Sequence, residues 1–384
     1  MIKVLTYNKI AEVGTDQFDK NKYDIADEHA DPDAILVRSA SLHEMEFAAS
    51  LKAIARAGAG TNNIPVDKCT EKGIVVFNTP GANANGVREL ATCALFLAAR
   101  DVVGGINWAQ SLEGDDVAKQ VEKGKAAFGG PEVRGKTLGV IGLGAIGALF
   151  ANSASKLGMK VIGYDPYMTV DAAWSISAQV KKAESLREIY ETSDYISLHV
   201  PANDSTKGMI NDEVLATVKK GVRILNFSRA ALVDEAAIVR ATEDGTVARY
   251  IVDFPTSGVL NKKNIIPIPH LGASTPESED NCAQMAAHQT LEYLENGNII
   301  NSVNMPTCVS ERSGTQRICV IHDNVPNMVG QISAILAQNN INIAGMINKS
   351  RNSIAYTVID VDGTVSGCEE KIRAIVEVKS VRTI

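Results

Sequence analysis

The sequence predicts an α/β protein with two doubly wound parallel sheets and a smaller βαββαβ module at its carboxyl-terminal end. Three observations lead to this prediction. Short apolar runs alternate with helical patterns over the first hundred residues. A glycine-rich turn at residue 142 opens a second series of this kind, and the order of the patterns changes after residue 315. A length of 384 residues fits two or three domains.

Composition excludes several classes of function. The chain is 45% hydrophobic and 22% charged, as is typical of globular proteins, and its net charge of −7 argues against nucleic-acid binding. No apolar run approaches the length of a membrane span, and the first seven residues read as a strand and not as a signal peptide. Six scattered cysteines without metal-type spacing indicate reduced thiols in a cytoplasmic protein and no metal site.

The first hundred residues contain four apolar runs that predict buried parallel strands, at 2–5, 34–37, 51–55 and 74–77. Residues 85–103 are a long apolar helix candidate. The segment 104–134 is richer in glycine and charge, so we expect a linker or an irregular crossing. The next domain begins at Gly135.

The glycine-rich turn has the order of a Rossmann-type dinucleotide site. An apolar run at 137–141 leads into Gly142-Leu143-Gly144-Ala145-Ile146-Gly147, a helical pattern follows, and the next apolar run ends on Asp165. The glycines allow a tight turn, close approach to a pyrophosphate, and close helix packing. The helix N-terminus favours phosphate, and Asp165 can accept the ribose hydroxyls while repelling a 2′-phosphate, which favours NAD over NADP. The residues expected to contact NAD here are Gly142, Gly144, Ala145, Ile146, Gly147 and Asp165.

Later strands are expected at 195–200, 223–227, 250–253 and 265–268, followed by a helix over 276–296. In a doubly wound sheet, ligands bind at the carboxyl ends of the strands. The residues at those ends complete the expected cofactor site: His199, Val200, Pro201, Phe227, Ser228, Asp253, Gly272 and Ala273.

Two residues at these strand ends suit hydride transfer to or from a 2-hydroxy acid. Such a reaction needs a cation for the carboxylate, and arginine binds carboxylates at two points. It also needs a base for the hydroxyl proton, and the ordinary pKa of histidine lies near the working pH. Arg229 and His270 fit these two roles, although either alone would more simply be an ion-pairing arginine or a packed histidine.

The last seventy residues predict a separate ferredoxin-like module. Residues 300–315 read as a linker. Strands at 317–322, 343–349, 353–360 and 380–384 and helices at 327–339 and 368–375 give the βαββαβ order. Because the module has no obvious nucleophile or metal site, we interpret it as regulatory or as an assembly domain.

Several longer motifs carry a specific resemblance. HVP at 199–201, NFSRxxxVDExA from Asn226 and PHLGASTPESE at 269–279 follow the glycine-rich turn, while RAGAGTNN at 56–63 and NTP at 78–80 precede it. With these motifs the chain resembles the D-isomer-specific 2-hydroxyacid dehydrogenases, and most of all those members that oxidise D-3-phosphoglycerate with NAD at the start of serine synthesis. The tail resembles an ACT domain.

The resemblance implies a discontinuous, flavodoxin-like substrate domain formed by 1–99 and 284–304, an NAD domain at 100–283 and an ACT domain at 316–384. It implies that Arg229 binds the substrate carboxylate and that His270 is the acid–base residue. The implied substrate contacts are Arg38 and Arg56 for the substrate phosphate, the backbone N–H groups of Gly58 and Ala59 near the carboxylate, and Asn83. L-serine, as an effector, would contact His322, Asn324 and Asn342. A homodimer or homotetramer is expected.

One position departs from the family pattern. The family pairs its histidine with a glutamate in a stretch like Asp-Phe-Pro-x-Glu, and here Ser257 stands in the place of that glutamate. A neighbouring carboxylate favours imidazolium. Without it we expect slower turnover, with reduction fading at lower pH than in relatives, unless Glu277 or Glu279 substitutes.

Three alternatives stay open from the sequence. The chain could be another 2-oxo-acid reductase, acting on hydroxypyruvate, glyoxylate or 2-oxoglutarate. It could be a weakly active protein that senses NAD and serine. The tail could serve dimerisation alone, and Arg38 could be a solvated arginine at a strand end.

Overall fold

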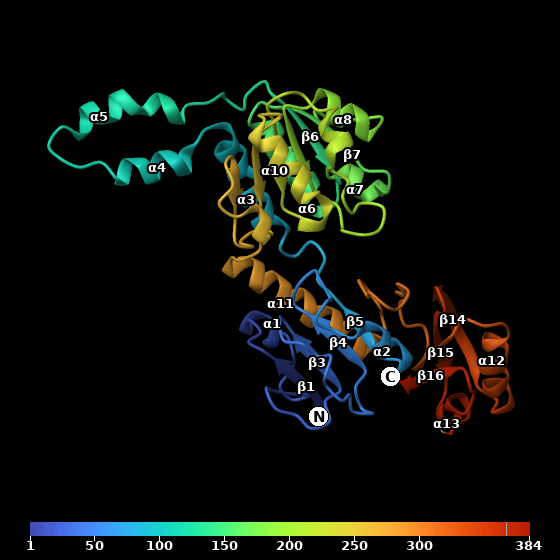
Figure 1. The fold of residues 1–384 in the computed structure, drawn as a ribbon. Coiled ribbons are helices and arrows are strands. Elements are labelled where there is room, and N and C mark those ends of the chain that lie inside the picture. The colour runs from blue at the N-terminus through green and yellow to red at the C-terminus, as the bar shows by residue number, and fades with distance from the viewer. Residues whose placement is uncertain (366) are drawn as a thin grey trace. The chain divides into compact units, whose positions relative to one another are not determined.

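A computed structural model describes residues 1–365 and 367–384 (Figure 1). It divides into two compact units: unit 1 contains Met1–Asn83 and Pro276–Ile384, and unit 2 contains Ala84–Thr275. This division falls at 83/84 and 275/276, whereas the sequence suggested 99/100 and 283/284. The tail belongs to unit 1 and does not separate as a third compact unit.

Unit 1 is built on a parallel five-stranded sheet in the order β2-β1-β3-β4-β5, which is the flavodoxin-like order. The four strands predicted from apolar runs are present, and β2 is an addition. Two short helices, α1 (Glu12–Thr15) and α2 (Val66–Glu71), accompany the sheet. The strands are β1 (Ile2–Tyr7), β2 (Tyr23–Ala26), β3 (Ala34–Val37), β4 (Ala53–Arg56) and β5 (Val75–Phe77).

The predicted helix at 276–296 returns to pack on this sheet. It forms α11 (Pro276–Leu291) and continues as a π-helical turn, η4 (Glu292–Asn296). Its small residues face inward: Ala283, Ala286 and Ala287 join Val4 and Phe77 in one buried cluster. Small side chains here let the helix lie close to the sheet and to α1.

The tail has the predicted βαββαβ order and forms an antiparallel sheet, β14-β15-β13-β16. Helices α12 and α13 cover it with a small core that includes Ile332 and Ile372. The elements are β13 (Gln316–Asp323), α12 (Met328–Gln338), β14 (Asn342–Arg351), β15 (Ile354–Asp362), α13 (Cys368–Arg373) and β16 (Val378–Thr383).

Three tail strands supply side chains that bond to carbonyl groups at the end of α11 and η4. Arg317 of β13 donates to the Asn296 carbonyl at 2.7 Å, Tyr356 of β15 donates to the Gly297 carbonyl at 2.7 Å, and Arg382 of β16 donates to the Tyr293 and Leu294 carbonyls. The last carbonyls of a helix lack partners within the helix, and cations are favoured beside them. The tail therefore caps α11.

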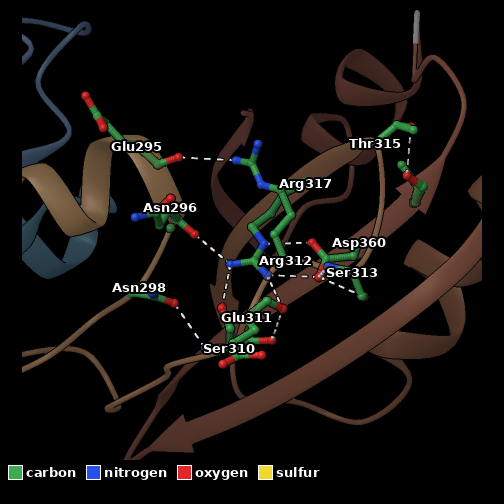
Figure 2. A network of polar contacts seen from close by, with 12 residues as sticks. Glu295, Asn296, Asn298, Ser310, Glu311, Arg312, Ser313, Thr315, Arg317 and Asp360 are labelled. Atoms are coloured by element: carbon green, nitrogen blue, oxygen red, sulfur yellow. Dashed lines mark hydrogen bonds and ion pairs between the residues drawn. The ribbon is translucent and has the colours of Figure 1, made fainter.

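Arg317 also fixes the segment that leads into the tail (Figure 2). Its guanidinium forms a bidentate ion pair with Asp360, at 2.7 and 2.9 Å, and donates to the Ser310 and Glu311 carbonyls. Both charged side chains are almost fully buried, at 1% and 3% exposed. Burial alone raises the pKa of Asp360, but bonds from Arg317 and Ser313 outweigh it and leave that pKa below its usual value. The expected linker is thus an ordered junction.

Unit 2 contains a parallel seven-stranded sheet in the order β12-β11-β10-β9-β6-β7-β8. The order reverses between β6 and β9, as in Rossmann-type sheets. Helices α3 (Ala84–Ala99) and α6 (Ala145–Lys156) pack together in one cluster with β6, whereas α8 (Leu186–Thr192) and α10 (Glu235–Glu243) pack in another. The strands are β6 (Thr137–Ile141), β7 (Lys160–Tyr164), β8 (Lys181–Lys182), β9 (Tyr195–Leu198), β10 (Val222–Asn226), β11 (Val247–Val252) and β12 (Ile265–Pro267).

The prediction of a linker at 104–134 was wrong. The segment forms α4 (Val102–Gln110), α5 (Val117–Gly124) and a 3₁₀ turn at Lys125–Phe128, which Figure 1 shows extending away from the body of unit 2. No residue of α4 or α5 is buried. Both helices are short and bury no residue, so the glycine and charge content of the segment suggested a linker instead.

Within the described residues, no helix is both long and apolar enough to span a bilayer.

Candidate active site

The glycine-rich turn joins β6 to α6 and has the geometry that its sequence predicted. Gly142 has φ +89°, which glycine adopts without strain. A Cβ on Gly147 would lie 2.0 Å from the Gly142 carbonyl oxygen, and one on Gly142 would lie 2.4 Å from the His199 carbonyl oxygen. Both positions must therefore be glycine for the helix, the turn and β9 to approach one another.

Gly144 has a different reason to be glycine. A Cβ there would meet no atom within 4 Å, so protein packing does not require its absence. Gly144 is the N-cap of α6, and no side chain caps the helix. The N–H groups of Ala145, Ile146 and Gly147 lie in the first turn of this uncapped helix, which is the arrangement that receives a pyrophosphate.

Asp165 follows β7 and lies beside the turn. Its carboxylate accepts hydrogen bonds from the Leu143 N–H at 2.8 Å and the Tyr167 N–H at 2.9 Å. A cavity of about 580 Å³ opens beside it, lined by Leu143, Tyr164, Asp165, Ile176 and Lys182 among others. The carboxylate is held by the backbone at the mouth of a space that suits an adenosine, and it has lone pairs left for ribose hydroxyls.

His199 lies behind the turn, packed on Phe150 with ring centroids 5.4 Å apart. Its Nε2 is 2.8 Å from the Ser197 hydroxyl, and its Nδ1 is buried with no partner among the described residues. Burial lowers the pKa of His199 to about 4, so the ring is neutral at physiological pH. This residue supports the turn, with Val200 and Pro201 following it.

Arg229 and His270, predicted as the chemical pair, both contact one aromatic ring in unit 2. The Arg229 guanidinium carbon is 4.9 Å from the centroid of Phe254, and the His270 ring centroid is 4.2 Å from it. Both polar side chains are exposed. Sequence reasoning missed Phe254 as a site residue, and the available signal was an aromatic residue directly after the strand-end aspartate Asp253.

Buried polar groups hold the loops that carry this pair. Asn226, fully buried at the end of β10, donates to the Arg229 carbonyl at 2.9 Å, and the Ser228 hydroxyl donates to the Leu198 carbonyl. Phe227 beside them is buried. Sequence reasoning missed Asn226 as a site residue because an asparagine at the end of a strand does not itself indicate a catalytic or binding role.

Asp253 acts on the histidine loop. It is 2% exposed and accepts from the Leu271 N–H at 2.8 Å and the Gly272 N–H at 2.9 Å. Burial raises its pKa, although those two bonds act in the opposite direction. His270 itself has φ +53°, an uncommon left-handed backbone for a non-glycine residue. Asp253 thus fixes the turn at residues 270–272, which Ala273 follows. Contact of Asp253 or Ala273 with NAD stays a prediction.

The carboxylates considered as substitutes at Ser257 have other positions. Glu279 receives the Arg38 guanidinium at 2.5 Å within unit 1, so it is already paired. Glu277 lies in the first turn of α11, also in unit 1. The carboxylate that reaches the 256–258 segment belongs instead to Glu235 of α10, which accepts the Thr256 hydroxyl.

The expected substrate residues gather at the carboxyl ends of β3 and β4 in unit 1. Arg56 donates from Nε to the Arg38 carbonyl at 2.9 Å. The Gly58 N–H, expected to face a carboxylate, donates to the Arg56 carbonyl at 2.9 Å, and the Ala59 carbonyl accepts from Asn78. Asn83 is half-buried at the end of this part of unit 1. Their contacts with substrate stay predictions.

The expected serine-binding residues are not together in one chain. His322 pairs with Ala355 and Asn342 pairs with Asp362, at opposite ends of β15, about 23 Å apart at the usual rise per residue. His322 is 2% exposed, with Nδ1 on the Asp323 carbonyl and Nε2 on the Thr357 hydroxyl, each at 2.8 Å. Asn324 lies near His322 and donates to the Asn352 carbonyl.

Comparison with known proteins gives a consistent family. Residues 98–272 match the family described as D-isomer specific 2-hydroxyacid dehydrogenase, NAD binding domain. A D-3-phosphoglycerate dehydrogenase of Haemophilus influenzae is 32% identical over 333 residues, covering 83% of this chain and 77% of that protein. One of Bacillus subtilis is 34% identical over 301 residues, 76% of this chain but 55% of that protein.

Solved structures agree with the fold. The NAD⁺-bound 3-phosphoglycerate dehydrogenase of Entamoeba histolytica matches with a TM-score of 0.62 at 28% identity, covering 79% of this chain and 98% of that one. A glyoxylate reductase from Paecilomyes thermophila matches with a TM-score of 0.65 at 26% identity, over 79% and 98%. The glycine-rich turn, the open end of α6 and Asp165 fit the NAD that this family uses, and the chain belongs to the D-isomer-specific 2-hydroxyacid dehydrogenases.

Proposed function

We propose that this protein oxidises D-3-phosphoglycerate to 3-phosphohydroxypyruvate with NAD, the first step of serine synthesis. The observation that carries the proposal is that Arg229 and His270 both contact the ring of Phe254. Relatives that are named for this reaction, and that match over three quarters of the chain or more, support the substrate.

The two exposed side chains divide the chemistry. Arg229 binds the substrate carboxylate, and its fork of N–H donors fixes the orientation of the 2-carbon. His270 takes the proton of the 2-hydroxyl through a ring nitrogen during oxidation and returns it during reduction. Bound NAD supplies the hydride acceptor. His270 must therefore be neutral for oxidation and protonated for reduction.

The decisive experiment follows NADH consumption with 3-phosphohydroxypyruvate, with and without millimolar L-serine. If serine suppresses turnover, the result supports both the proposed activity and the proposed regulation by serine. If serine does not change turnover, the result supports the proposed activity, and the tail is interpreted as an assembly module alone. NADH binding without turnover of any 2-oxo acid would select the sensing protein instead.

The second candidate is a reductase of unphosphorylated 2-oxo acids, and the match to a glyoxylate reductase favours it. The two candidates differ in the use of the substrate phosphate. For a phosphorylated substrate, replacing Arg56 with alanine raises KM for 3-phosphohydroxypyruvate more than KM for glyoxylate. For the reductase, the two KM values change together.

Serine regulation is the further part of this proposal. The ACT-like strand order and the short polar side chains at strand ends support it, because such groups can hold an amino acid. Since Asn342 lies at the far end of the sheet from His322 and Asn324, one serine can contact all three only if a second copy contributes Asn342. Replacing Asn342 with alanine should raise the serine concentration for half-inhibition and leave uninhibited turnover unchanged.

A homo-oligomer is proposed for an independent reason. Val102, Val103 and Ile106 of α4 and Val117 of α5 are each at least 40% exposed, while Trp108 of α4 contacts Phe128 of the following 3₁₀ turn with ring centroids 5.2 Å apart. An apolar face of this kind is typical of an interface between copies. Light scattering of an Ile106→Glu variant tests it, with a smaller particle expected than for the unmodified chain.

A cytoplasmic location is proposed from the thiols. All six cysteines are free, and all but Cys93 are buried. A reducing compartment suits such thiols.

A further inference from the structure

We propose that Phe254 is a positioning residue that holds Arg229 and His270 in register, in place of a carboxylate at position 257. This inference rests on the proposed reaction. The ring lies 4.9 Å from the guanidinium carbon of Arg229 and 4.2 Å from the imidazole centroid, with the two rings tilted by 43°. A ring face attracts a cation, so Phe254 suits both a guanidinium and an imidazolium.

The ring of Phe254 contacts both functional groups, Arg229 through its guanidinium and His270 through its imidazole. Apart from the ring, the Arg229 guanidinium donates to the carbonyl of the adjacent Ser228 at 2.7 Å. No hydrogen bond from a described residue reaches the His270 imidazole. Phe254 is half-buried, whereas the aromatic residues Phe150 and Phe227 of the same unit are buried. A half-exposed ring that contacts two exposed polar groups is placed for the site and not for the core.

The backbone around Phe254 is fixed on both sides. On one side, Asp253 accepts two N–H groups of the turn that carries His270, so the two loops cannot move apart freely. On the other side, Thr256 donates its hydroxyl to the Glu235 carboxylate. A Cβ on Gly258 would lie 1.7 Å from Glu235 Oε1, so the carboxylate occupies the place of a side chain there. Glu235 therefore anchors the segment that Ser257 leaves without an acid.

The ring also lines a cavity. It has a volume of about 360 Å³ and is lined by Phe254, Glu235, Val233, Tyr250, Thr256 and Val259 among others. A ring that borders a cavity is not packed on all sides, so its position depends on how its backbone is held. Glu235 and Asp253 supply that restraint from α10 and from the end of β11.

The test compares Phe254→Leu, which removes the ring, with Phe254→Tyr, which keeps it. We expect Phe254→Leu to lower kcat roughly 100-fold and to raise KM for the 2-oxo acid, while the NADH dissociation constant stays the same. In the Phe254→Tyr variant, kcat and KM should stay close to those of the unmodified enzyme. Phe18→Leu, a buried ring in unit 1, is the matched control and should lower thermal stability without this kinetic change.

The anchor is tested separately. Glu235→Ala should lower kcat, and Glu235→Gln, which keeps an acceptor for Thr256, should recover most of the loss. The proposal is overturned if Phe254→Leu leaves kcat and KM unchanged, or if Phe254→Tyr is as impaired as Phe254→Leu in a folded protein. If the unmodified enzyme reduces glyoxylate but not 3-phosphohydroxypyruvate, the proposed substrate fails and the Phe254 comparison proceeds with glyoxylate. If it reduces neither, both proposals fail.

Discussion

Arg229 and Arg317 have the same side chain in opposite environments, since Arg229 is exposed and Arg317 is buried. Arg317 is 1% exposed and donates to Asp360 and to three carbonyl groups. Arg229 is exposed, donates to the neighbouring Ser228 carbonyl and otherwise rests on the face of Phe254. A guanidinium whose donors are all occupied stabilises a fold, whereas one whose fork points to solvent can bind a carboxylate. The comparison separates the buried junction of unit 1 from the exposed site of unit 2.

The largest effect on stability is expected at the junction. Replacing Arg317 with methionine leaves Asp360 buried without its cation, and breaking such a pair costs about 3–5 kcal/mol of unfolding free energy. Urea unfolding measures the loss. Arg240→Met removes an exposed pair with Asp212 and should leave the unfolding midpoint in place. Equal midpoints for both variants would remove the distinction between junction and surface.

The largest effect on turnover is expected in the other region. Replacing His270 with asparagine removes the proton acceptor, and general acid–base groups contribute about 10²–10⁴-fold to rates. Stopped-flow and steady-state assays should show that loss in kcat, with the unfolding free energy and NADH binding nearly unchanged. If the His270→Asn variant retained turnover, the proton transfer would have to be assigned to another group.

A smaller effect is expected from the pH dependence of stability. The pKa of His199 is about 4 in the fold, below the ordinary value near 6.5, so the unfolded chain binds the proton more readily. Stability from this group is complete above pH 6.5 and is lost as pH falls toward 4. Between pH 7 and 5 the unmodified protein should lose about 1–2 kcal/mol more than His199→Gln. Parallel pH profiles for the two proteins would contradict the burial argument.

The smallest effect is expected from Ser257→Glu. A carboxylate near His270 favours imidazolium, which reduction requires. The pH at which reduction falls to half its maximum should therefore rise by a fraction of a unit to about one unit. Ser257→Gln has the same shape without the charge and should not shift the profile. A profile that both variants leave unmoved would show that position 257 does not reach the histidine.

Much of this fold was predictable because local rules determined it. The glycine-rich turn, the strands around it and the βαββαβ tail follow from periodicity and from backbone geometry at Gly142 and Gly147. The short strand β2 and helices α4 and α5 were not predicted, because all three elements are short and no residue of α4 or α5 is buried. Arg229 and His270 were identified by their chemistry, and the structure places both on one ring.

What the sequence could not supply were relations between distant positions. Phe254, Asn226 and Glu235 matter through what they touch, and each alone reads as an ordinary core, strand-end or helix residue. The same holds for Arg38, whose pairing with Glu279 joins positions 241 residues apart. His322 matched a motif in sequence, but its ring nitrogens are already engaged within the sheet.

The capping of α11 by three tail strands bears on how such modules can be exchanged between proteins. Cys319, Ile321 and Tyr356 of the tail lie in the same buried cluster as Phe77 and Tyr293 of the preceding region. Cutting the chain before β13 would expose that surface and remove the side-chain donors that Arg317, Tyr356 and Arg382 supply to the carbonyls of residues 293–297. A tail transplanted from another enzyme would need to bring its own donors for residues 293–297 and a matching apolar face. Swapping such tails therefore requires moving the end of α11 with them, so that the natural unit of recombination includes the helix.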